Sequence, residues 1–302
     1  MRFFGSKKTA NSVAISSGSS YLSVSRVVSG RGRPKVLRYA EEKLNGVGPE
    51  HQLHSLVSKN KLRNESVSTC LDIDEYQLLS IEAPAVPEDE LLDALKWQVA
   101  EFVETPVDDL ALEFYDVPSV SNIGKGRQVN VVVVKKSIIE AKAQQIKSAG
   151  LNLTTIDVPE LAIRNLMNSV GLDKNGVVFL YISGEKSLLV FVRKSIMYFC
   201  RTLNIGSRHL AQQPQLTKEL AQEVQRSLEY FERHFNAVGI ERMVVAPMSG
   251  KMPDVAGYLD KKLSIPCAYF DYQANFKWRR RLPKSKSSIS VLSLGAALRT
   301  GD

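Results

Sequence analysis

The chain has little cysteine and histidine, the side chains that most often bind transition metals or form disulfides. Its three cysteines, Cys70, Cys200 and Cys267, lie far apart and form no CxxC pair. We interpret them as single buried thiols in a reducing compartment, where free cysteine behaves as a small apolar side chain. Of the four histidines, His51 and His54 can share one face of a helix, but no third ligand stands nearby. No metal site is therefore expected.

Long hydrophobic runs are missing as well. A membrane-spanning helix requires roughly 18–20 consecutive apolar residues. The longest candidates, at 129–134 and 177–192, are strand-like and interrupted by polar side chains. The N-terminal segment Met1–Lys8 has no hydrophobic core of the kind that a secretory signal needs. We therefore expect a cytoplasmic protein, held at a surface only through a partner.

Negative charge is absent from the start of the chain, where no Asp or Glu lies between Met1 and Tyr39. The segment Val13–Ser20, followed by Tyr21–Val28, is typical of a strand, a Gly/Ser turn and a second strand. Small residues in such a turn let backbone N–H groups approach a phosphate, and the candidates are Gly18, Ser19 and Ser20. A phosphate site that performs chemistry usually also needs a carboxylate for its metal ion. The shape favours a nucleotide fold, and the missing acid argues against nucleotide turnover.

Positive charge is concentrated instead. The chain carries a formal net charge of +8, and Lys277–Lys286 supplies six positive charges and no negative one. A solvated basic loop is one interpretation. Attraction to an anionic lipid surface is a second, because each Lys or Arg near such a surface contributes about 1 kcal/mol. Nucleic acid is the weakest alternative, since one patch without interleaved aromatics or a known module is poor support.

Strands and helices alternate along the chain, which favours an α/β fold. Both halves open with three strands and a first turn of small residues; the expected strands are 12–18, 21–29 and 35–44, then 177–183, 187–193 and 196–203. Such an internal repeat is stronger than any single motif. The second half adds the candidate phosphate-turn residues Ser183 and Gly184, and a further turn with Ser249 and Gly250. This duplicated, ribonuclease-H-like plan is that of the actin-like ATPase fold, in which nucleotide sits between the halves.

The repeat predicts two domains. The first covers residues 1–170, carries an inserted small α+β subdomain at about 80–155, and is completed by a C-terminal helix at 289–302. The second covers 171–288, with a reduced small subdomain. Within the insertion, a helix at 88–103 is expected to bury an apolar face that includes Phe102. No element is expected between residue 72 and Pro84.

Four segments in this order give the chain a family resemblance: Ala94–Leu110 with Leu112–Tyr115, Ser148–Leu151 with Ile156–Ala162, Gln225–Phe231, and Leu294–Arg299. Together they resemble the PilM family of type IV pilus assembly proteins, in particular its members from the MSHA pilus. The resemblance covers most of the chain. The cytoplasmic domain of type II secretion GspL proteins is a near relative, although GspL carries a membrane span.

The resemblance also shows where this chain departs from nucleotide-binding members of the family. Their first turn reads Asp-x-Gly-Ser, and Ser16 stands here in place of that Asp. The second turn should carry an Asp where this chain has Tyr181 or Ile182, and the usual Gly-Gly of the adenosine side reads Met248-Ser249-Gly250. Without these acids, Mg²⁺-dependent phosphoryl transfer loses the groups that neutralise developing charge. The resemblance thus implies a vestigial nucleotide site, no catalytic residues and no cofactor, with ATP binding as the open alternative.

The resemblance further implies the kind of partner. In the PilM family, the cytosolic N-terminal segment of a PilN-like inner-membrane protein lies in a groove beside the inserted subdomain, here the region Glu88–Val158. We therefore expect a cytoplasmic adaptor, peripheral to the inner membrane, that links this partner to the pilus assembly ATPase or platform proteins. The alternatives are an active or nucleotide-regulated ATPase of the same machinery, a GspL-like secretion component, and a nucleic-acid-binding protein.

Overall fold

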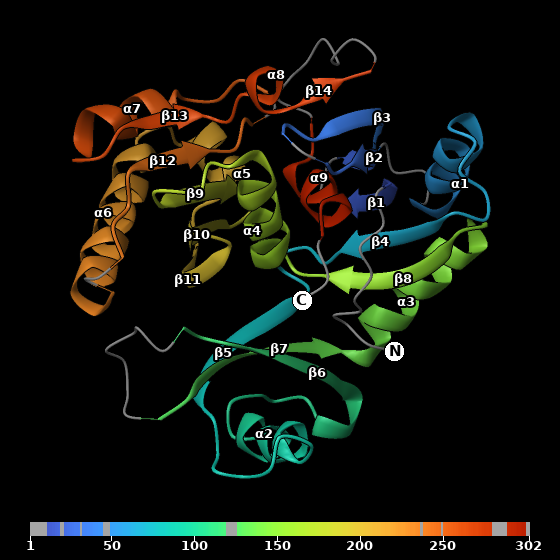
Figure 1. Cartoon of the computed structure of the whole chain (residues 1–302), viewed down its shortest axis with the longest axis horizontal. Helices are drawn as coiled ribbons and strands as arrows, with labels where there is room; N and C mark the ends of the chain where they lie inside the picture. Colours follow the sequence, from blue (N-terminus) through green and yellow to red (C-terminus); the bar gives the residue numbers. More distant parts are fainter. Residues whose placement is uncertain are drawn as a thin grey trace.

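A computed structural model describes residues 11–18, 21–30, 32–44, 49–118, 126–235, 238–248, 250–279 and 289–299. The described chain forms two mixed β-sheets that face each other across a layer of helices, with a smaller sheet set apart from both (Figure 1). Among the described residues, no helix is both long enough and apolar enough to cross a bilayer.

The first sheet belongs mainly to the N-terminal half and has the strand order β14-β3-β2-β1-β4-β8. Its strands are β1 (Asn11–Ser17), β2 (Tyr21–Val28), β3 (Lys35–Lys43), β4 (Ser66–Cys70), β8 (Asn152–Asp157) and β14 (Lys277–Trp278). Strands β1, β2 and β3 form an antiparallel meander, whereas β4 and β8 run parallel to β1. Helices α1 (Pro49–Lys59) and α3 (Lys136–Ser148) pack on its outer side, with Leu53 and Ile146 in one apolar cluster.

The second sheet repeats this pattern in the order β11-β10-β9-β12-β13. Its strands are β9 (Val177–Ile182), β10 (Ser187–Arg193), β11 (Ile196–Leu203), β12 (Arg242–Val245) and β13 (Cys267–Tyr269). Strands β9, β10 and β11 again form an antiparallel meander, and β12 and β13 run parallel to β9. The central strand β9 is apolar along almost its whole length because both of its faces are covered. The predicted duplication is therefore confirmed.

Two helices fill the space between the sheets: α4 (Pro159–Val170) and α9 (Val291–Ala297). Helix α4 begins with proline at its first turn and ends at Gly171 in the left-handed conformation (φ 72°), the usual start and stop signals. The two helices touch at Gly295, where a Cβ atom would lie 2.1 Å from the carbonyl oxygen of Ala162. Glycine is required here because any side chain would push the two backbones apart.

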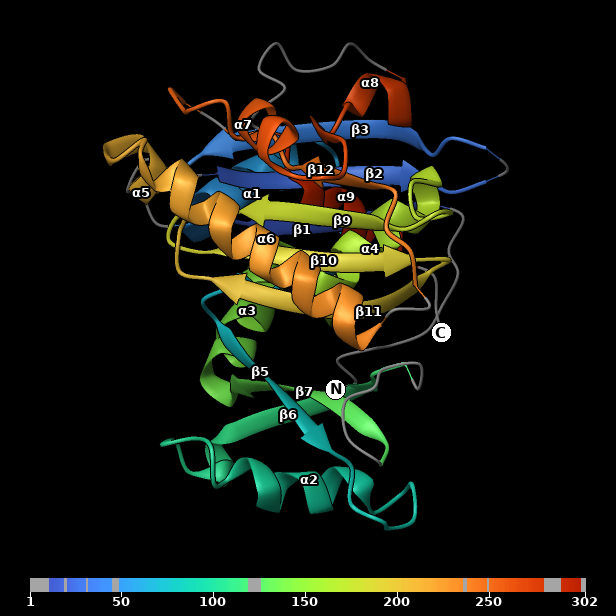
Figure 2. The same cartoon turned by 90° about the vertical axis from the view of Figure 1, so that its left-hand side faces the viewer.

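The outer face of the second sheet is covered by the long helix α6 (Leu216–His234), seen lying across the strands in Figure 2. Its apolar side chains recur at intervals of three and four residues, so that Leu220, Val224 and Phe231 are buried on one face. Phe231 stacks on Phe191 of β10, with ring centroids 4.6 Å apart. Short helices α5 (Ser207–Gln212), α7 (Val255–Lys262) and α8 (Tyr272–Asn275) complete this half.

The small sheet is the inserted α+β subdomain. It has the order β5-β7-β6, formed by β5 (Tyr76–Glu82), β6 (Leu110–Asp116) and β7 (Gln128–Lys135). Helix α2 (Leu91–Val99) packs on it through Leu91, Leu95 and Val99, and a 3₁₀ turn, η1 (Val107–Asp109), precedes β6. In Figure 2, α2 lies on the side of this sheet farthest from the rest of the molecule.

Several details differ from the sequence expectations. Strand β5 occupies a segment for which no element was expected. The insertion was expected to reach about residue 155, but α3 and β8 belong to the body of the first half, where they contact the first sheet. Strand β14 pairs with β3 of the first sheet, within the range expected for the second domain. Phe102 is 61% exposed, because α2 ends at Val99 and the following turn breaks the helical periodicity.

Candidate functional site

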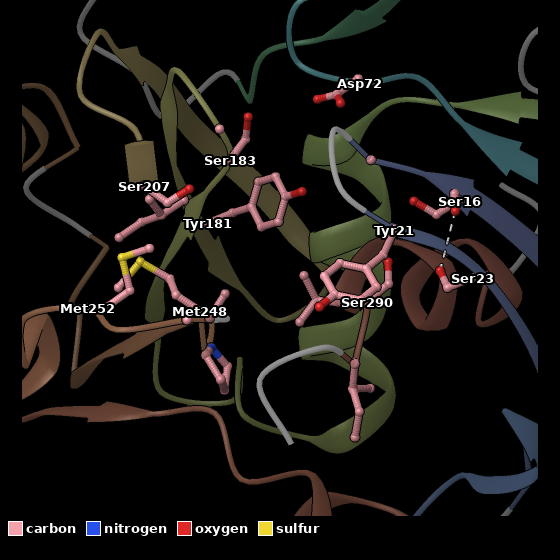
Figure 3. A pocket seen from close by; sticks show the side chains of 18 of the residues that line it. Ser16, Tyr21, Ser23, Asp72, Tyr181, Ser183, Ser207, Met248, Met252 and Ser290 are labelled. Carbon is pink, nitrogen blue, oxygen red and sulfur yellow. Dashed lines mark hydrogen bonds between the residues drawn. The ribbon is translucent and has the colours of Figure 1, made fainter. Parts of the chain in front are cut away.

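A cleft of about 410 Å³ opens between the two large sheets, at the ends of their first strands. It is lined by the β1–β2 hairpin on one side and by the β9–β10 turn and the segment after β12 on the other (Figure 3). The loop after β4, the start of α5 and the residues that lead into α9 close the remaining walls.

Four of the seven candidate nucleotide-binding residues line this cleft: Gly18, Ser183, Gly184 and Gly250. Ser19, Ser20 and Ser249 lie outside the described residues. Two turns that are more than 160 residues apart in the sequence therefore face one cavity. That arrangement agrees with the position of a nucleotide in the expected fold, but it does not by itself show that a nucleotide binds.

The first turn is closed by bonds within its own hairpin. Ser16, which stands where the metal-organising acid was expected, is only 5% exposed. Its carbonyl oxygen accepts a hydrogen bond from the Ser23 hydroxyl at 3.3 Å (Figure 3), and the Gly18 N–H donates to the carbonyl oxygen of Tyr21 at 2.9 Å. The Gly18 N–H is thus already paired and does not point at a phosphate. A hydroxyl at position 16 also carries no charge with which to hold a cation.

In the second turn, the residue that faces the cleft is aromatic. The ring of Tyr181 projects from the end of β9 into the cavity (Figure 3). Burial is the largest cause that raises the pKa of its phenol, with smaller contributions from Asp72 and Cys70, so the group stays neutral at physiological pH. The Ser183 N–H, like that of Gly18, is used inside its own turn, where it donates to the carbonyl oxygen of Lys186 at 2.8 Å.

The start of α5 packs directly on this second turn. The N–H groups of Ser207 and Arg208 donate to the carbonyl oxygens of Ser183 and Gly184 at 2.8 and 3.0 Å. Gly206 permits this approach, because a Cβ atom there would lie 2.3 Å from the backbone of the turn. The first N–H groups of a helix are ordinarily available to bind an anion. Here two of them bind the protein's own backbone.

One carboxylate does line the cleft, and the sequence analysis did not single it out. Asp72 follows β4, and its Oδ1 accepts a hydrogen bond from the N–H of Ile73 at 2.7 Å. Burial is the main cause that raises the pKa of this carboxyl group, which weakens it as a ligand for a cation. The pairing of β4 with β1, which the sequence does not reveal, brings Asp72 to the edge at which these parallel strands end.

The described residues contain no group of three or more His, Cys, Asp or Glu side chains that could hold a metal ion. A single partly buried carboxylate, opposite a neutral phenol, does not supply the ligands that Mg²⁺ prefers. On the expected adenosine side, Met248 and Met252 present thioethers to the cavity (Figure 3). The cleft lies between the two halves of the duplicated fold, and its side chains do not fit Mg²⁺-dependent phosphoryl transfer.

An ion pair beside the cleft joins the two lobes of the fold, which are built around the first and the second large sheet. The Lys186 ammonium, on the β9–β10 turn, lies 2.7 Å from a carboxylate oxygen of Asp74, on the loop between β4 and β5. The rim carries further charge at Arg208, but this guanidinium is paired with Glu185 at 2.6 Å.

The two sheets with one topology, the helices between them and the cleft at their strand ends define a protein of the actin-like ATPase fold. No protein-family model matches the sequence. Among solved structures, a chain of the PilM–PilN type IV pilus biogenesis complex is similar over 95% of this chain and 97% of its own, with a TM-score of 0.76 and 20% identity. The cytoplasmic domain of EpsL, an inner-membrane component of the Vibrio cholerae type II secretion system, is similar over 95% and 94%, with a TM-score of 0.52 and 14% identity.

Proposed function

We propose that this protein is a cytoplasmic adaptor of a type IV pilus assembly machine, of the MSHA kind, that binds the cytosolic N-terminal segment of a PilN-like inner-membrane protein. The adaptor would sit at the inner face of that membrane and connect its partner to the assembly ATPase or platform proteins. The observation that carries the proposal is the likeness to the PilM–PilN complex, which extends through the inserted subdomain and both lobes.

The chemistry of the cleft supports an adaptor over an ATPase. Ser16 stands where one metal-organising acid was expected and Tyr181 or Ile182 where the second was expected, and the N–H groups of Gly18 and Ser183 are used within their own turns. Hydrolysis of ATP needs a cation and donors aimed at the γ-phosphate. Among the described residues that line this cleft, Asp72 is the one carboxylate, and the N–H groups of Gly18 and Ser183 are already paired, so we expect no turnover. The seven candidate residues are thus proposed as a vestigial nucleotide site.

The inserted subdomain is the proposed binding region, within the range Glu88–Val158. An extended peptide can be captured there through backbone hydrogen bonds and a few side-chain pockets. Membrane contact through the basic segment Lys277–Lys286 also stays a prediction. Of that segment the structure describes Lys277, Trp278 and Arg279, and Arg280–Lys286 lie outside the described residues.

The decisive experiment is titration of the purified full chain with a fluorescent peptide that contains the cytosolic N-terminal segment of the PilN-like protein from the same pilus system. We expect a dissociation constant below about 100 μM, and no binding of a scrambled peptide of the same composition. Failure of the peptide to bind at about 1 mM would reject the adaptor proposal.

A second arm separates the adaptor from the alternative of an active or nucleotide-regulated ATPase. Isothermal titration with ATP and Mg²⁺, together with a phosphate-release assay, should show no steady release of phosphate. Tight ATP binding with sustained release would favour the ATPase. Specific binding of the cytosolic segment of a type II secretion partner, in place of the pilus segment, would favour a GspL-like role.

A further inference from the structure

The charge of this chain is divided very unevenly between the insertion and the rest. Between Tyr76 and Lys135 there are eleven acidic and four basic residues, so this segment has a formal charge of −7. The whole chain carries +8, and the remainder is therefore +15. A division of charge of this size bears on association between molecules and not on the fold.

The negative charge is concentrated around α2, on the side of the insertion that faces away from the body. Asp93 and Trp97 are exposed one turn apart on α2, and Glu101 is exposed in the turn that follows the helix. Trp97 is 81% exposed and Phe102 is 61% exposed. We call this surface the acidic α2 face. Its acids without an ion pair among the described residues are Asp89, Glu90, Glu101, Glu104, Asp108 and Asp109.

A second surface has the opposite charge. Arg33, Lys35, Lys277 and Arg279 are all exposed at the β3–β14 edge of the first sheet, and none of them forms an ion pair with a described residue. Lys35 and Lys277 are register partners on neighbouring strands. Two like charges placed side by side on a sheet destabilise it unless an anion lies between them. We call this surface the basic sheet edge.

The two surfaces lie at opposite ends of the molecule. In both Figure 1 and Figure 2 the strand β3 and helix α8 stand at one extreme and α2 stands at the other. We propose that copies of this chain associate head to tail, with the acidic α2 face of one copy against the basic sheet edge of the next. Because the contact joins two different surfaces on opposite ends, it leaves both outer ends free and builds an open row.

The side chains of each surface fit this contact. The face of an exposed indole attracts Lys and Arg, and the attraction grows when water is excluded. Trp97 can therefore receive a cation from the basic edge, and Glu101, in the turn after α2, adds negative charge, whereas Asp93 is already paired with Lys96 at 2.5 Å. Tryptophan is also among the residue types that contribute most to a contact once neighbouring groups exclude water.

Charge decides between this occupant and others. An anionic membrane or a nucleic acid matches only the basic sheet edge, whereas a second copy carries a surface that matches each of the two. The net charge of +8 makes distant copies repel one another. That repulsion is screened beyond about 10 Å at 0.1 M salt, while a direct contact between opposite charges persists.

Sedimentation velocity of the purified full chain tests the proposal, with a concentration series from about 5 to 500 μM at roughly 50 mM salt. We expect the weight-average sedimentation coefficient to rise with concentration beyond the value of a dimer, and to fall at about 500 mM salt. A chain that stays monomeric throughout the series, or that stops at the dimer, would overturn the head-to-tail arrangement.

Variants identify the two surfaces. Trp97→Ala, Glu101→Lys and Lys277→Glu should each weaken association by about tenfold or more, whereas Lys218→Glu, an equal change of charge at an exposed site on α6, should not. Combining Glu101→Lys and Lys277→Glu in one chain should restore association, because every contact then joins two reversed surfaces. Association that is indifferent to both reversals would contradict the assignment, as would binding of the basic edge to vesicles of about 30% anionic lipid without any self-association.

Discussion

The same two strands contribute both to the buried interface between the lobes and to the cleft above it. On each strand, the residue in the interface and the residue in the cleft are only two positions apart. On β1, Ala14 is fully buried in the inter-lobe core, and Ser16, on the same face, lines the cleft. On β9, Phe179 and Tyr181 are related in the same way. The core positions keep apolar side chains that hold the lobes together, whereas the cleft positions carry a hydroxyl and a phenol. The architecture is therefore maintained by contacts that do not depend on nucleotide chemistry.

The strongest test of the interface is Gly295→Ala. A methyl group at this position would lie 2.1 Å from the carbonyl oxygen of Ala162, so α4 and α9 must separate and the inter-lobe core must loosen. We expect the free energy of unfolding to fall by about 3 kcal/mol or more, measured by urea denaturation. The matched control is Gly30→Ala at an exposed site with nothing within 4 Å, which should change stability by less than about 0.5 kcal/mol. Equal effects of the two substitutions would show that the α4–α9 contact is not tight.

One buried acid breaks the apolar character of the interface and provides the second test. Glu160 of α4 is 1% exposed, and the Tyr76 hydroxyl lies 2.7 and 2.6 Å from its two carboxylate oxygens. Burial raises the pKa of this carboxyl from its usual 4.5 to about 7, although the Tyr76 hydrogen bond opposes the shift. The folded protein thus holds this proton more tightly than the unfolded chain does.

The sign of the pH dependence follows from that difference. As pH rises from about 4.5 to about 7, the unfolded chain releases the proton first, so Glu160 lowers stability over this window and its effect levels off above pH 7. The loss is at most about 3 kcal/mol. Glu160→Gln removes the ionisation and keeps an oxygen acceptor for Tyr76. We expect it to match the parent near pH 5 and to be roughly 1–3 kcal/mol more stable at pH 8, in urea titrations at each pH. Parallel pH profiles for Glu160→Gln and the parent would contradict this.

The sequence predicted the parts of the fold that local patterns encode. Alternating apolar strands, the proline and glycine that bound α4, and the repeated three-strand opening were enough to indicate the duplicated fold. Strand β5 was missed because its pairing with β7 is a contact between distant segments, and its own residues show weak alternation. Phe102 was misplaced because the periodicity continues past the point at which the helix ends.

The candidate site divides in the same way. Gly18, Ser183, Gly184 and Gly250 were found from turn composition, and the structure brings them to one cavity. Asp72 was not found, because nothing in the sequence around it resembles a motif and its role depends on which strands are neighbours. The bonds that occupy the N–H groups of Gly18 and Ser183 are also invisible in a sequence, since they depend on the exact turn geometry.

The ion pair between Lys186 and Asp74 tests how much the cleft itself contributes to holding the lobes together. Both side chains remain partly exposed, at 36% and 45%, so the pair is screened by water and salt. We expect Lys186→Ala to lower stability by only about 0.2–1 kcal/mol, and the coupling energy in a double-mutant cycle with Asp74→Ala to vanish in about 1 M salt. Lys218→Ala serves as the control at an exposed site on α6. A coupling energy above about 2 kcal/mol would mean that contacts at the cleft, like those in the core below it, contribute strongly to holding the lobes together.

The smallest expected effect concerns Asp72, the carboxylate that lines the cleft. A ligand that binds the folded state raises the melting temperature, and the stabilisation grows with the logarithm of its concentration relative to its dissociation constant. Burial raises the pKa of Asp72, and the cleft positions of Ser16 and Tyr181 carry no second acid, so we expect Mg²⁺ to bind weakly. About 10 mM Mg²⁺ should therefore shift the melting temperature by less than about 1 °C. Asp72→Asn should show the same lack of response, since the amide oxygen can still accept from the N–H of Ile73. A Mg²⁺-dependent rise of several degrees that Asp72→Asn abolishes would make Asp72 a metal ligand. The cleft would then bind a metal ion, and it would no longer differ from the apolar inter-lobe core in the way described above.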